Sequence, residues 1–153
     1  MKTLEEIIKQ EPVFLNDFES RFDVVAGFED IYLTEDEYNA ESAPYVNKKC
    51  LEEKKSDYDK AAIKHKDHNI IFASYGHANY SGEAFVLVVK DNILYEVNAN
   101  HCSCYGIENQ WQLEETDLLS LKHRLLAGNL GTSDYCENEF RSKLMEFLGV
   151  ENA

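Results

Sequence analysis

The sequence predicts an α+β protein, with a helical, acidic N-terminal half, a three-stranded antiparallel meander and two C-terminal helices. Apolar residues recur at helical spacing near both ends of the chain, whereas between residues 69 and 97 they form short runs separated by turn residues. The length of 153 residues is that of one domain. We therefore expect a single domain over 1–153, with a helical acidic part at 1–66, the meander and a following turn at 69–115, and closing helices at 116–149.

The N-terminal helices are predicted from capping residues and charge. Thr3 and Glu6 have the spacing of a capping box, so a helix is expected to begin at once. Asn16 is a second candidate cap, and the helix that follows it would end near Gly27. The stretch from residue 46 to residue 66 has mixed charges and few apolar residues, which indicates an exposed helix.

The central part of the chain has the pattern of three strands. Ile70–Tyr75 is rich in β-forming residues, and Gly76–Gly82 has the composition of a loop. Ala84–Lys90 is almost wholly apolar, which indicates a central strand buried on both faces. Asp91-Asn92 has the length of a tight hairpin turn, and the alternating run Ile93–Val97 completes the meander.

Two helices are predicted after the meander. Thr116 or Asp117 would cap the first, which runs to Leu126, and Ser133 or Asp134 would cap the second. Five leucines would form the apolar face of the first helix: Leu118, Leu119, Leu121, Leu125 and Leu126.

The charge balance restricts the class of partner. The chain has 15 basic and 29 acidic residues and a formal net charge of −14. Such a charge opposes direct binding to nucleic acid or to an anionic membrane, because both carry negative phosphates. No apolar run is long enough to span a bilayer, and the N-terminus lacks the apolar region of a secretory signal. We therefore expect a cytoplasmic protein with reduced cysteines. Its acidic charge favours a basic partner, or serves only to keep a solvated surface soluble.

The acidic residues are concentrated in one part of the chain. Residues 16–46 contain nine acids and one base, a local balance of 1 − 9 = −8. Carboxylates that are crowded in this way can imitate phosphates for lysine and arginine side chains of a partner. The candidate partner-binding residues are Asp17, Glu19, Glu29, Asp30, Glu35, Asp36 and Glu37.

A second candidate site lies at His101-Cys102-Ser103-Cys104. Imidazole and thiolate are natural zinc ligands, so His101, Cys102 and Cys104 are the candidate metal ligands. The fourth ligand would come from elsewhere in the chain: Cys50, His77, His123 or Cys136. Two alternatives remain open, namely a cysteine nucleophile with a histidine base, and small thiols that only shape a tight turn. The chain lacks the paired C-x₂-C elements of common zinc sites, so no cofactor is assigned.

No catalytic residues are assigned, because the chain contains no phosphate-binding glycine loop, serine nucleophile motif or H-E-x-x-H motif.

The segment Asn69–Glu115 resembles a widespread type of small phage-encoded protein. The features shared are a strand ending in A-S-Y, a glycine-bearing loop, an apolar strand, a K-D turn, L-Y-E-V, and then H-C-S-C-x-G-x-E-x-Q-W. The resemblance implies a phage or mobile-element setting and implies no reaction.

These observations favour a binding protein over an enzyme. The preferred hypothesis is a phage or mobile-element accessory protein that binds and inhibits a host protein, such as a nucleic-acid-binding defence protein, through its acidic surface. The alternative from a different class is a zinc-supported or cysteine-based site at the His101-Cys104 segment. A third hypothesis is a homodimer formed through apolar helix faces.

Overall fold

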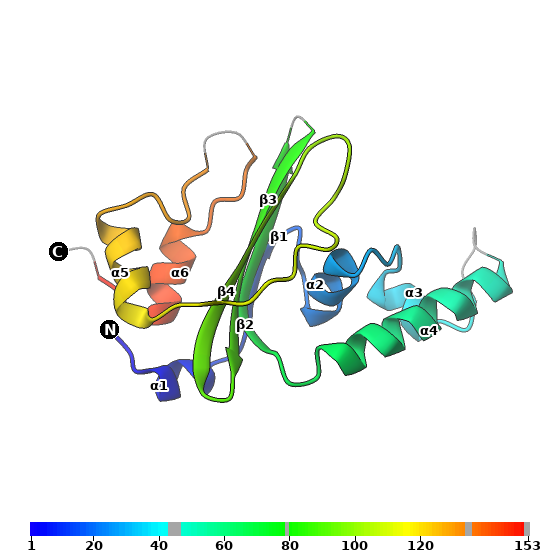
Figure 1. Ribbon diagram of the computed structural model, residues 1–153, viewed down its shortest axis with the longest axis horizontal. Helices are drawn as coiled ribbons and strands as arrows, with labels where there is room; N and C mark the ends of the chain where they lie inside the picture. The colour runs from blue at the N-terminus through cyan, green and yellow to red at the C-terminus, as the bar shows by residue number, and fades with distance from the viewer. Residues whose placement is uncertain (43–46, 79, 134–135, 152–153) are drawn as a thin grey trace.

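The computed structural model describes residues 1–42, 47–78, 80–133 and 136–151, and shows a five-stranded mixed sheet with helices on both faces (Figure 1). The α+β class is confirmed. The strand order is β1-β2-β3-β4-β5, with β1 parallel to β2 and the other neighbours antiparallel. The strands are β1 (Val13–Asn16), β2 (Asn69–Ala78), β3 (Ser81–Lys90), β4 (Ile93–His101) and β5 (Glu114–Glu115).

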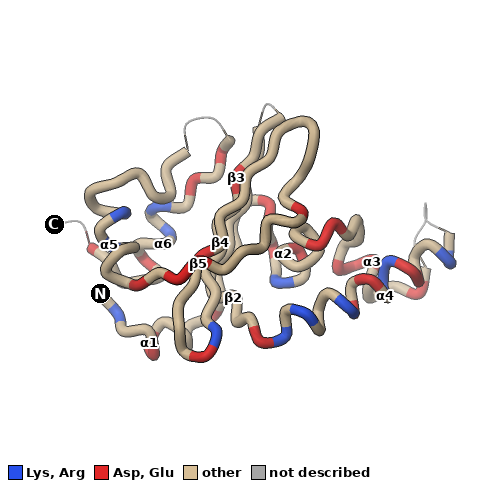
Figure 2. The backbone as a smooth tube through the Cα atoms, viewed as in Figure 1, with Lys and Arg blue, Asp and Glu red and all other residues tan. Residues whose placement is uncertain are grey.

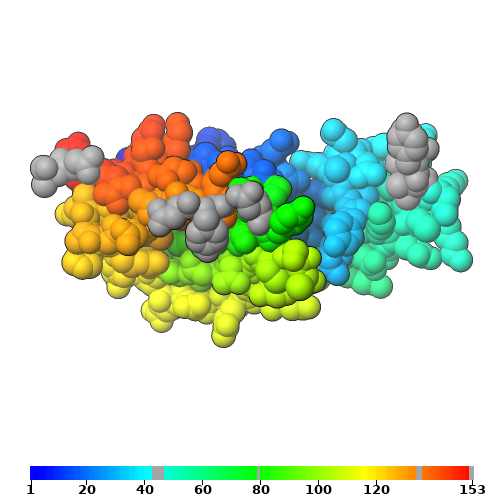
Figure 3. All heavy atoms as spheres, turned by 90° about the horizontal axis from the view of Figure 1, so that it is seen from above, coloured from blue at the N-terminus to red at the C-terminus, as the bar shows by residue number. Residues whose placement is uncertain are grey.

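The helices form two groups on opposite faces of the sheet (Figure 1). One face is covered by α1 (Leu4–Ile8), α5 (Leu118–Leu126) and α6 (Arg141–Leu148). The other face is covered by α2 (Arg21–Phe28). Helix α4 (Lys48–Lys64) packs against α2, and α3 (Glu35–Asn39) packs against α4. Seen from above, residues of α3 and α4 form one end of an elongated molecule, away from the sheet (Figure 3).

Each face of the sheet has its own apolar core, because side chains alternate along the strands. On the face of α1, α5 and α6, Phe85 and Leu87 of β3 pack with Leu121 and Leu144. The intervening β3 residues contribute to the second core, which lies against Phe18 and Phe28. Strand β3 is therefore buried on both sides, as its continuous apolar run predicted.

Several local predictions are confirmed by hydrogen bonds. Thr3 and Glu6 form the predicted capping box at the start of α1. Asp117 caps α5 by accepting a hydrogen bond from the Ser120 backbone N–H at 2.7 Å. Asp91 and Asn92 form the two-residue connection between β3 and β4, and both have positive φ, 53° and 62°, which primed hairpin turns require.

The three-stranded meander is wrong as a description of the whole sheet, because β1 and β5 extend it at both edges. Strand β1 lies where the sequence predicted only helices, and four residues are too few to show an alternating pattern. Asn16 is not a helix cap: it ends β1 with a φ of 59°, and α2 begins five residues later, at Arg21 after the Ser20 cap. The Asn16 amide instead donates to Ser74 Oγ at 2.8 Å.

The loop predicted at Gly76–Gly82 is also shorter than expected. Strand pairing continues to Ala78 and resumes at Ser81, because His77 pairs with Gly82 and Ala78 with Ser81. Asn79, in the middle of the predicted loop, lies outside the described residues. Strands β2 and β3 therefore stay paired as far as Ala78 and Ser81.

The closing helices differ from prediction in position and in their buried face. The last helix begins at Arg141 and not near Ser133, whose hydroxyl instead accepts a hydrogen bond from the Asn138 backbone N–H at 3.1 Å. Asp134, the other predicted cap, lies outside the described residues. In α5 the leucine face is narrower than predicted, because Leu119 is 72% exposed and Leu126 is exposed.

The predicted exposed helix over 46–66 is present as α4, which begins at Lys48 after the Asn47 cap. Residue 46 lies outside the described part of the chain. None of the helices within the described ranges combines the length and the apolar character needed to cross a membrane.

Candidate functional site

A groove with an apolar floor and an acidic rim lies on the α2 face of the sheet. Two adjoining cavities of about 510 and about 180 Å³ share Ala26, Gly27, Ile31, Tyr32 and Tyr75 and together form it. We call it the acidic groove. Its remaining lining residues are Asp17, Phe18, Asp23, Asp30, Leu33, Thr34, Glu37, His77, Gly106, Ile107 and Glu108. None of these described lining residues is a lysine or an arginine.

The groove is built by three segments that are distant in sequence. Helix α2 and the segment after it provide Ala26, Gly27 and Ile31, and strand β2 provides Tyr75. The third segment is the chain after β4, which returns across this face (Figure 1). It is held there by a hydrogen bond from the Asn109 backbone N–H to the Phe28 carbonyl at 3.3 Å and by burial of Ile107.

The tyrosine at the floor of the groove has a raised pKa, first because it is buried and second because carboxylates lie near it. Burial, together with the nearby carboxylates of Asp17 and Glu108, raises the pKa of Tyr75 to about 12. Each of these effects disfavours the phenolate, because the anion loses hydration and lies close to other negative charges. A cationic group in the same position would be favoured by the same carboxylates.

The carboxylates of the larger cavity are held in place by the protein. Asp17 is hydrogen-bonded through its carboxylate to Nδ1 of the exposed His77. Asp23 accepts a hydrogen bond from the Glu19 backbone N–H at 2.9 Å. Glu37 belongs to the capping box of α3 and accepts from the Thr34 backbone N–H at 3.0 Å. These contacts fix side chains that would otherwise lose conformational freedom when a ligand binds.

At the smaller cavity, Asp30 and Glu108 face the same apolar surface as the exposed ring of Tyr32. Tyr32 is 80% exposed although it carries a large apolar ring. Asp30 has a φ of 57°, a left-handed conformation that aspartate tolerates better than most residues. The face of an aromatic ring is a common contact for a lysine or arginine side chain.

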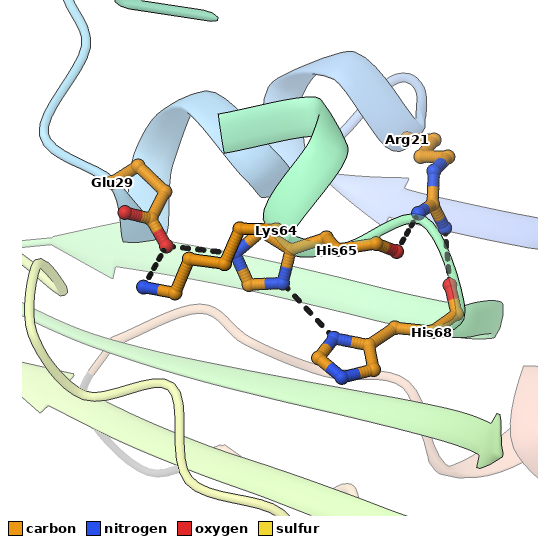
Figure 4. A network of polar contacts seen from close by, with 5 residues as sticks. All are labelled: Arg21, Glu29, Lys64, His65 and His68. Atoms are coloured by element: carbon orange, nitrogen blue, oxygen red, sulfur yellow. Dashed lines mark hydrogen bonds and ion pairs between the residues drawn. The ribbon is translucent and has the colours of Figure 1, made fainter. Parts of the chain in front are cut away.

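The predicted acidic residues do not all reach this surface, and Glu29 is used inside the protein (Figure 4). Its Oε1 atom lies 2.7 Å from Lys64 Nζ and 2.7 Å from His65 Nε2. Burial raises the pKa of Glu29, but the hydrogen bonds and charges of Lys64 and His65 outweigh this and lower it overall. Glu29 therefore joins α2 to the end of α4.

The same network continues to the start of β2. His65, only 1% exposed, has its Nδ1 atom 3.0 Å from His68 Nδ1, and Trp111 packs against both rings. Arg21 donates to the carbonyl oxygens of His65 and His68, both at 2.6 Å (Figure 4). Burial lowers the pKa of both histidines. We interpret this network as structural, since its atoms bind one another.

Four of the predicted acidic residues are exposed and make no ion pair with the described basic residues: Glu19, Asp30, Glu35 and Asp36. Figure 2 shows that acidic positions dominate the stretch from α2 to α3, whereas α4 carries both signs. Asp17, Asp30 and Glu37 line the acidic groove, whereas Glu19, Glu35 and Asp36 are neighbours in sequence of its lining residues Phe18, Thr34 and Glu37. Sequence reasoning missed Tyr32 and Tyr75, because only the folded chain places them among carboxylates.

The turn after β4 does not bring its three candidate ligands together. His101 packs over Gly82, where an added Cβ would lie 2.1 Å from His101 Nε2, and its ring contacts Tyr75 and His77. Cys102 and Cys104 are exposed. Cys50 lies on the distant helix α4, and Cys136 is buried. Among the described residues, no group of three or more histidine, cysteine or acidic side chains has the arrangement to hold a metal ion.

Comparisons of the chain with family models, curated protein sequences and solved structures found no match.

Proposed function

We propose that the protein is a phage or mobile-element accessory protein that uses the acidic groove to bind, and thereby block, a basic surface of a host protein. The single observation that supports this function is the groove itself, where five carboxylates surround an apolar floor and no described lining residue is a lysine or an arginine. Such a site complements a cationic segment and repels an anionic one.

The form of the groove suggests the chemistry of the segment that it takes. Carboxylates alone would attract any cation, but the floor of Ala26, Ile31 and Ile107 offers apolar surface as well. The occupant that satisfies both is a peptide segment with one leucine or phenylalanine flanked by lysine or arginine. The apolar side chain would supply hydrophobic binding energy and the flanking cations would supply specificity.

A basic segment of this kind is typical of surfaces that contact nucleic-acid phosphates. A host protein that is bound at such a segment cannot bind nucleic acid with it at the same time. The proposed mechanism is therefore occlusion of a nucleic-acid-binding surface. This proposal keeps six of the predicted partner-binding residues: Asp17, Glu19, Asp30, Glu35, Asp36 and Glu37. It adds Asp23 and Glu108, and it excludes Glu29.

The proposal is tested by measuring the affinity of the full-length protein for synthetic peptides by fluorescence anisotropy. One peptide carries a leucine flanked by lysines and arginines, a second has glycine in place of the leucine, and a third has glutamates in place of the cations. We expect the first to bind most tightly and the third not to bind. Raising the NaCl concentration from about 50 to about 300 mM should weaken the binding, because salt screens exposed charges.

Matched variants distinguish the groove from general charge. The pair Asp23→Asn and Asp30→Asn removes two charges from the groove, while Glu52→Gln and Asp57→Asn removes two exposed charges from α4. The groove pair should weaken binding about tenfold and the control pair less than about twofold. Equal losses from the two pairs, or no binding by the leucine peptide at low salt, would refute the proposed site.

A further inference from the structure

Cys102 and Cys104 are arranged differently from the other two cysteines of the chain. They lie on either side of Ser103 in a turn closed by a β-bridge between Cys102 and Tyr105, so Ser103 and Cys104 form its two central residues. Both cysteines are exposed. The turn lies directly after β4, at the end of the sheet where His77 and His101 meet.

The sulfur of Cys102 accepts a hydrogen bond from the turn. The Cys104 backbone N–H donates to Cys102 Sγ, with an N–S distance of 3.4 Å. The Tyr105 backbone N–H and the Cys104 thiol also lower the pKa of Cys102. A backbone N–H directed at a sulfur favours the thiolate over the thiol, because the charged form is the stronger acceptor.

The Cys104 backbone N–H makes the largest contribution to lowering the pKa of Cys102, and burial opposes this without reversing it. The thiolate is the reactive form of cysteine, so Cys102 is suited to attack a disulfide. Cys104 is then suited to attack the mixed disulfide that Cys102 forms. A disulfide forms without backbone movement only if the two Cα atoms lie within roughly 7 Å of each other. Two cysteines that are separated by one residue in a turn meet this condition.

We propose that Cys102 and Cys104 form a reactive dithiol that closes reversibly to a disulfide when it meets a low-molecular-weight disulfide such as glutathione disulfide. The Cys102 thiolate attacks one sulfur, the S–S bond of the reagent breaks, and one glutathione leaves and takes up a proton. The Cys104 thiol then loses its proton and attacks the Cys102 sulfur of the mixed disulfide. The second glutathione leaves, so the protein loses two hydrogen atoms, which the reagent gains.

The closed form would change the turn that precedes Gly106 and Glu108. A disulfide replaces the hydrogen bond of the Cys102 sulfur with a covalent link to Cys104. It would therefore restrict the conformation of the turn between Cys102 and Tyr105. The neighbouring wall of the acidic groove begins only two residues later. The dithiol proposal does not require the groove to bind a partner, so the experiments below test it independently of the proposed function.

The test treats the reduced full-length protein with glutathione disulfide, followed by tryptic digestion and mass spectrometry. Both cysteines lie in the tryptic segment 91–122. We expect this segment to lose the mass of two hydrogen atoms and to carry no glutathione. In Cys104→Ser, glutathione should remain attached to Cys102, because the resolving thiol is absent. Wild-type protein that retains glutathione on Cys102, or that does not react, would overturn the proposal.

Rates provide a second, independent measurement with an internal control. Cys50 is exposed in the first turn of α4 and its sulfur accepts no described backbone hydrogen bond, so it provides a comparison thiol within the same chain. We expect iodoacetamide to label Cys102 at least about five times faster than Cys50 at pH 7, because a larger fraction is thiolate. Equal rates would show that the turn does not activate the sulfur. Circular dichroism of each serine variant checks that the fold is retained.

Discussion

At the scale of single residues, the His65–His68 pair makes the folded state sensitive to acid. Burial lowers the pKa of both side chains below the usual value of 6.5, and for His65 the hydrogen bond and charge of Glu29 oppose this only in part. As the pH falls below 6.5, the unfolded chain takes up protons that the folded protein does not. The contribution of the pair to stability is thus present above pH 6.5 and is lost as the pH falls toward the lowered values.

We expect the free energy of unfolding, measured by urea titration, to fall between pH 7 and pH 5 by up to about 1.4 kcal/mol per pH unit for each histidine. The double variant His65→Asn and His68→Asn should show a smaller fall over the same range. His123→Asn, which changes an exposed histidine on α5, is the control and should keep the wild-type slope. A double variant with an unchanged slope would exclude these histidines as the cause.

The sequence predicted residue roles well where the partner was close in the chain. The Thr3–Glu6 and Asp117–Ser120 contacts each span three residues, so the local pattern contains all the information needed. The use of Glu29 inside the protein depends on His65, which lies 36 residues further along. Only tertiary structure brings these two residues together, so the sequence left Glu29 among the free carboxylates.

At the scale of elements, one ion pair fastens α5 to the sheet. Arg124 of α5 donates to both carboxylate oxygens of Glu96 on β4, at 2.7 and 3.1 Å, and Glu96 is only 7% exposed. Burial raises the pKa of Glu96, but the hydrogen bonds from Arg124 and Asn98 and the charge of Arg124 lower it overall. The carboxylate therefore depends on the guanidinium to remain charged in a buried position.

Arg124→Met should lower the free energy of unfolding at pH 7 by about 1–3 kcal/mol, because it leaves a nearly buried carboxylate without its cation. Urea titration measures the change. The double variant Glu96→Gln with Arg124→Met removes both charges and should lose less stability than the single variant. If the two lose the same amount, the cost comes from the packing of Arg124 and not from the unpaired carboxylate.

The misread elements share a physical cause, which is that long-range contacts and not local propensity form them. The four residues of β1 form a strand because they pair with β2, which follows more than 50 residues later. The segment before α6 similarly takes its form from tertiary packing, since Gly76 of β2 leaves room for the Asn138 backbone, 2.6 Å from where a Cβ would lie. The antiparallel strands β2, β3 and β4 were predictable because adjacent hairpins require only local signals.

At the scale of the whole molecule, burial divides the chain into a tightly packed sheet and a less buried helical end. Strands β2, β3 and β4 contribute to cores on both faces, whereas the cluster under α4 contains few buried residues and α3 contains none. The acidic groove lies where these two parts meet. The sequence located its carboxylates along the chain but could not locate the floor, because three separate segments build it.

We expect hydrogen exchange, measured by mass spectrometry, to be slowest in β2, β3 and β4 and clearly faster in α3 and α4. Opening α3 and α4 exposes little apolar surface, whereas opening the central strands exposes both cores. Leu51→Ala removes a buried side chain from the helical end and should speed exchange in α4 more than in β3. Equal acceleration throughout would show that the chain opens as one unit.

The first and last described helices meet on the side of the sheet opposite the acidic groove. The Lys2 backbone N–H donates to the Leu148 carbonyl at 2.9 Å, and Gln10 donates to Phe147 at 2.9 Å. A fluorophore, affinity handle or surface tether attached at Met1 would therefore project away from α2, which lies on the other face of the sheet (Figure 1). A sample immobilised through this residue would present the groove to the solution, so sensor-based measurements can use it for attachment.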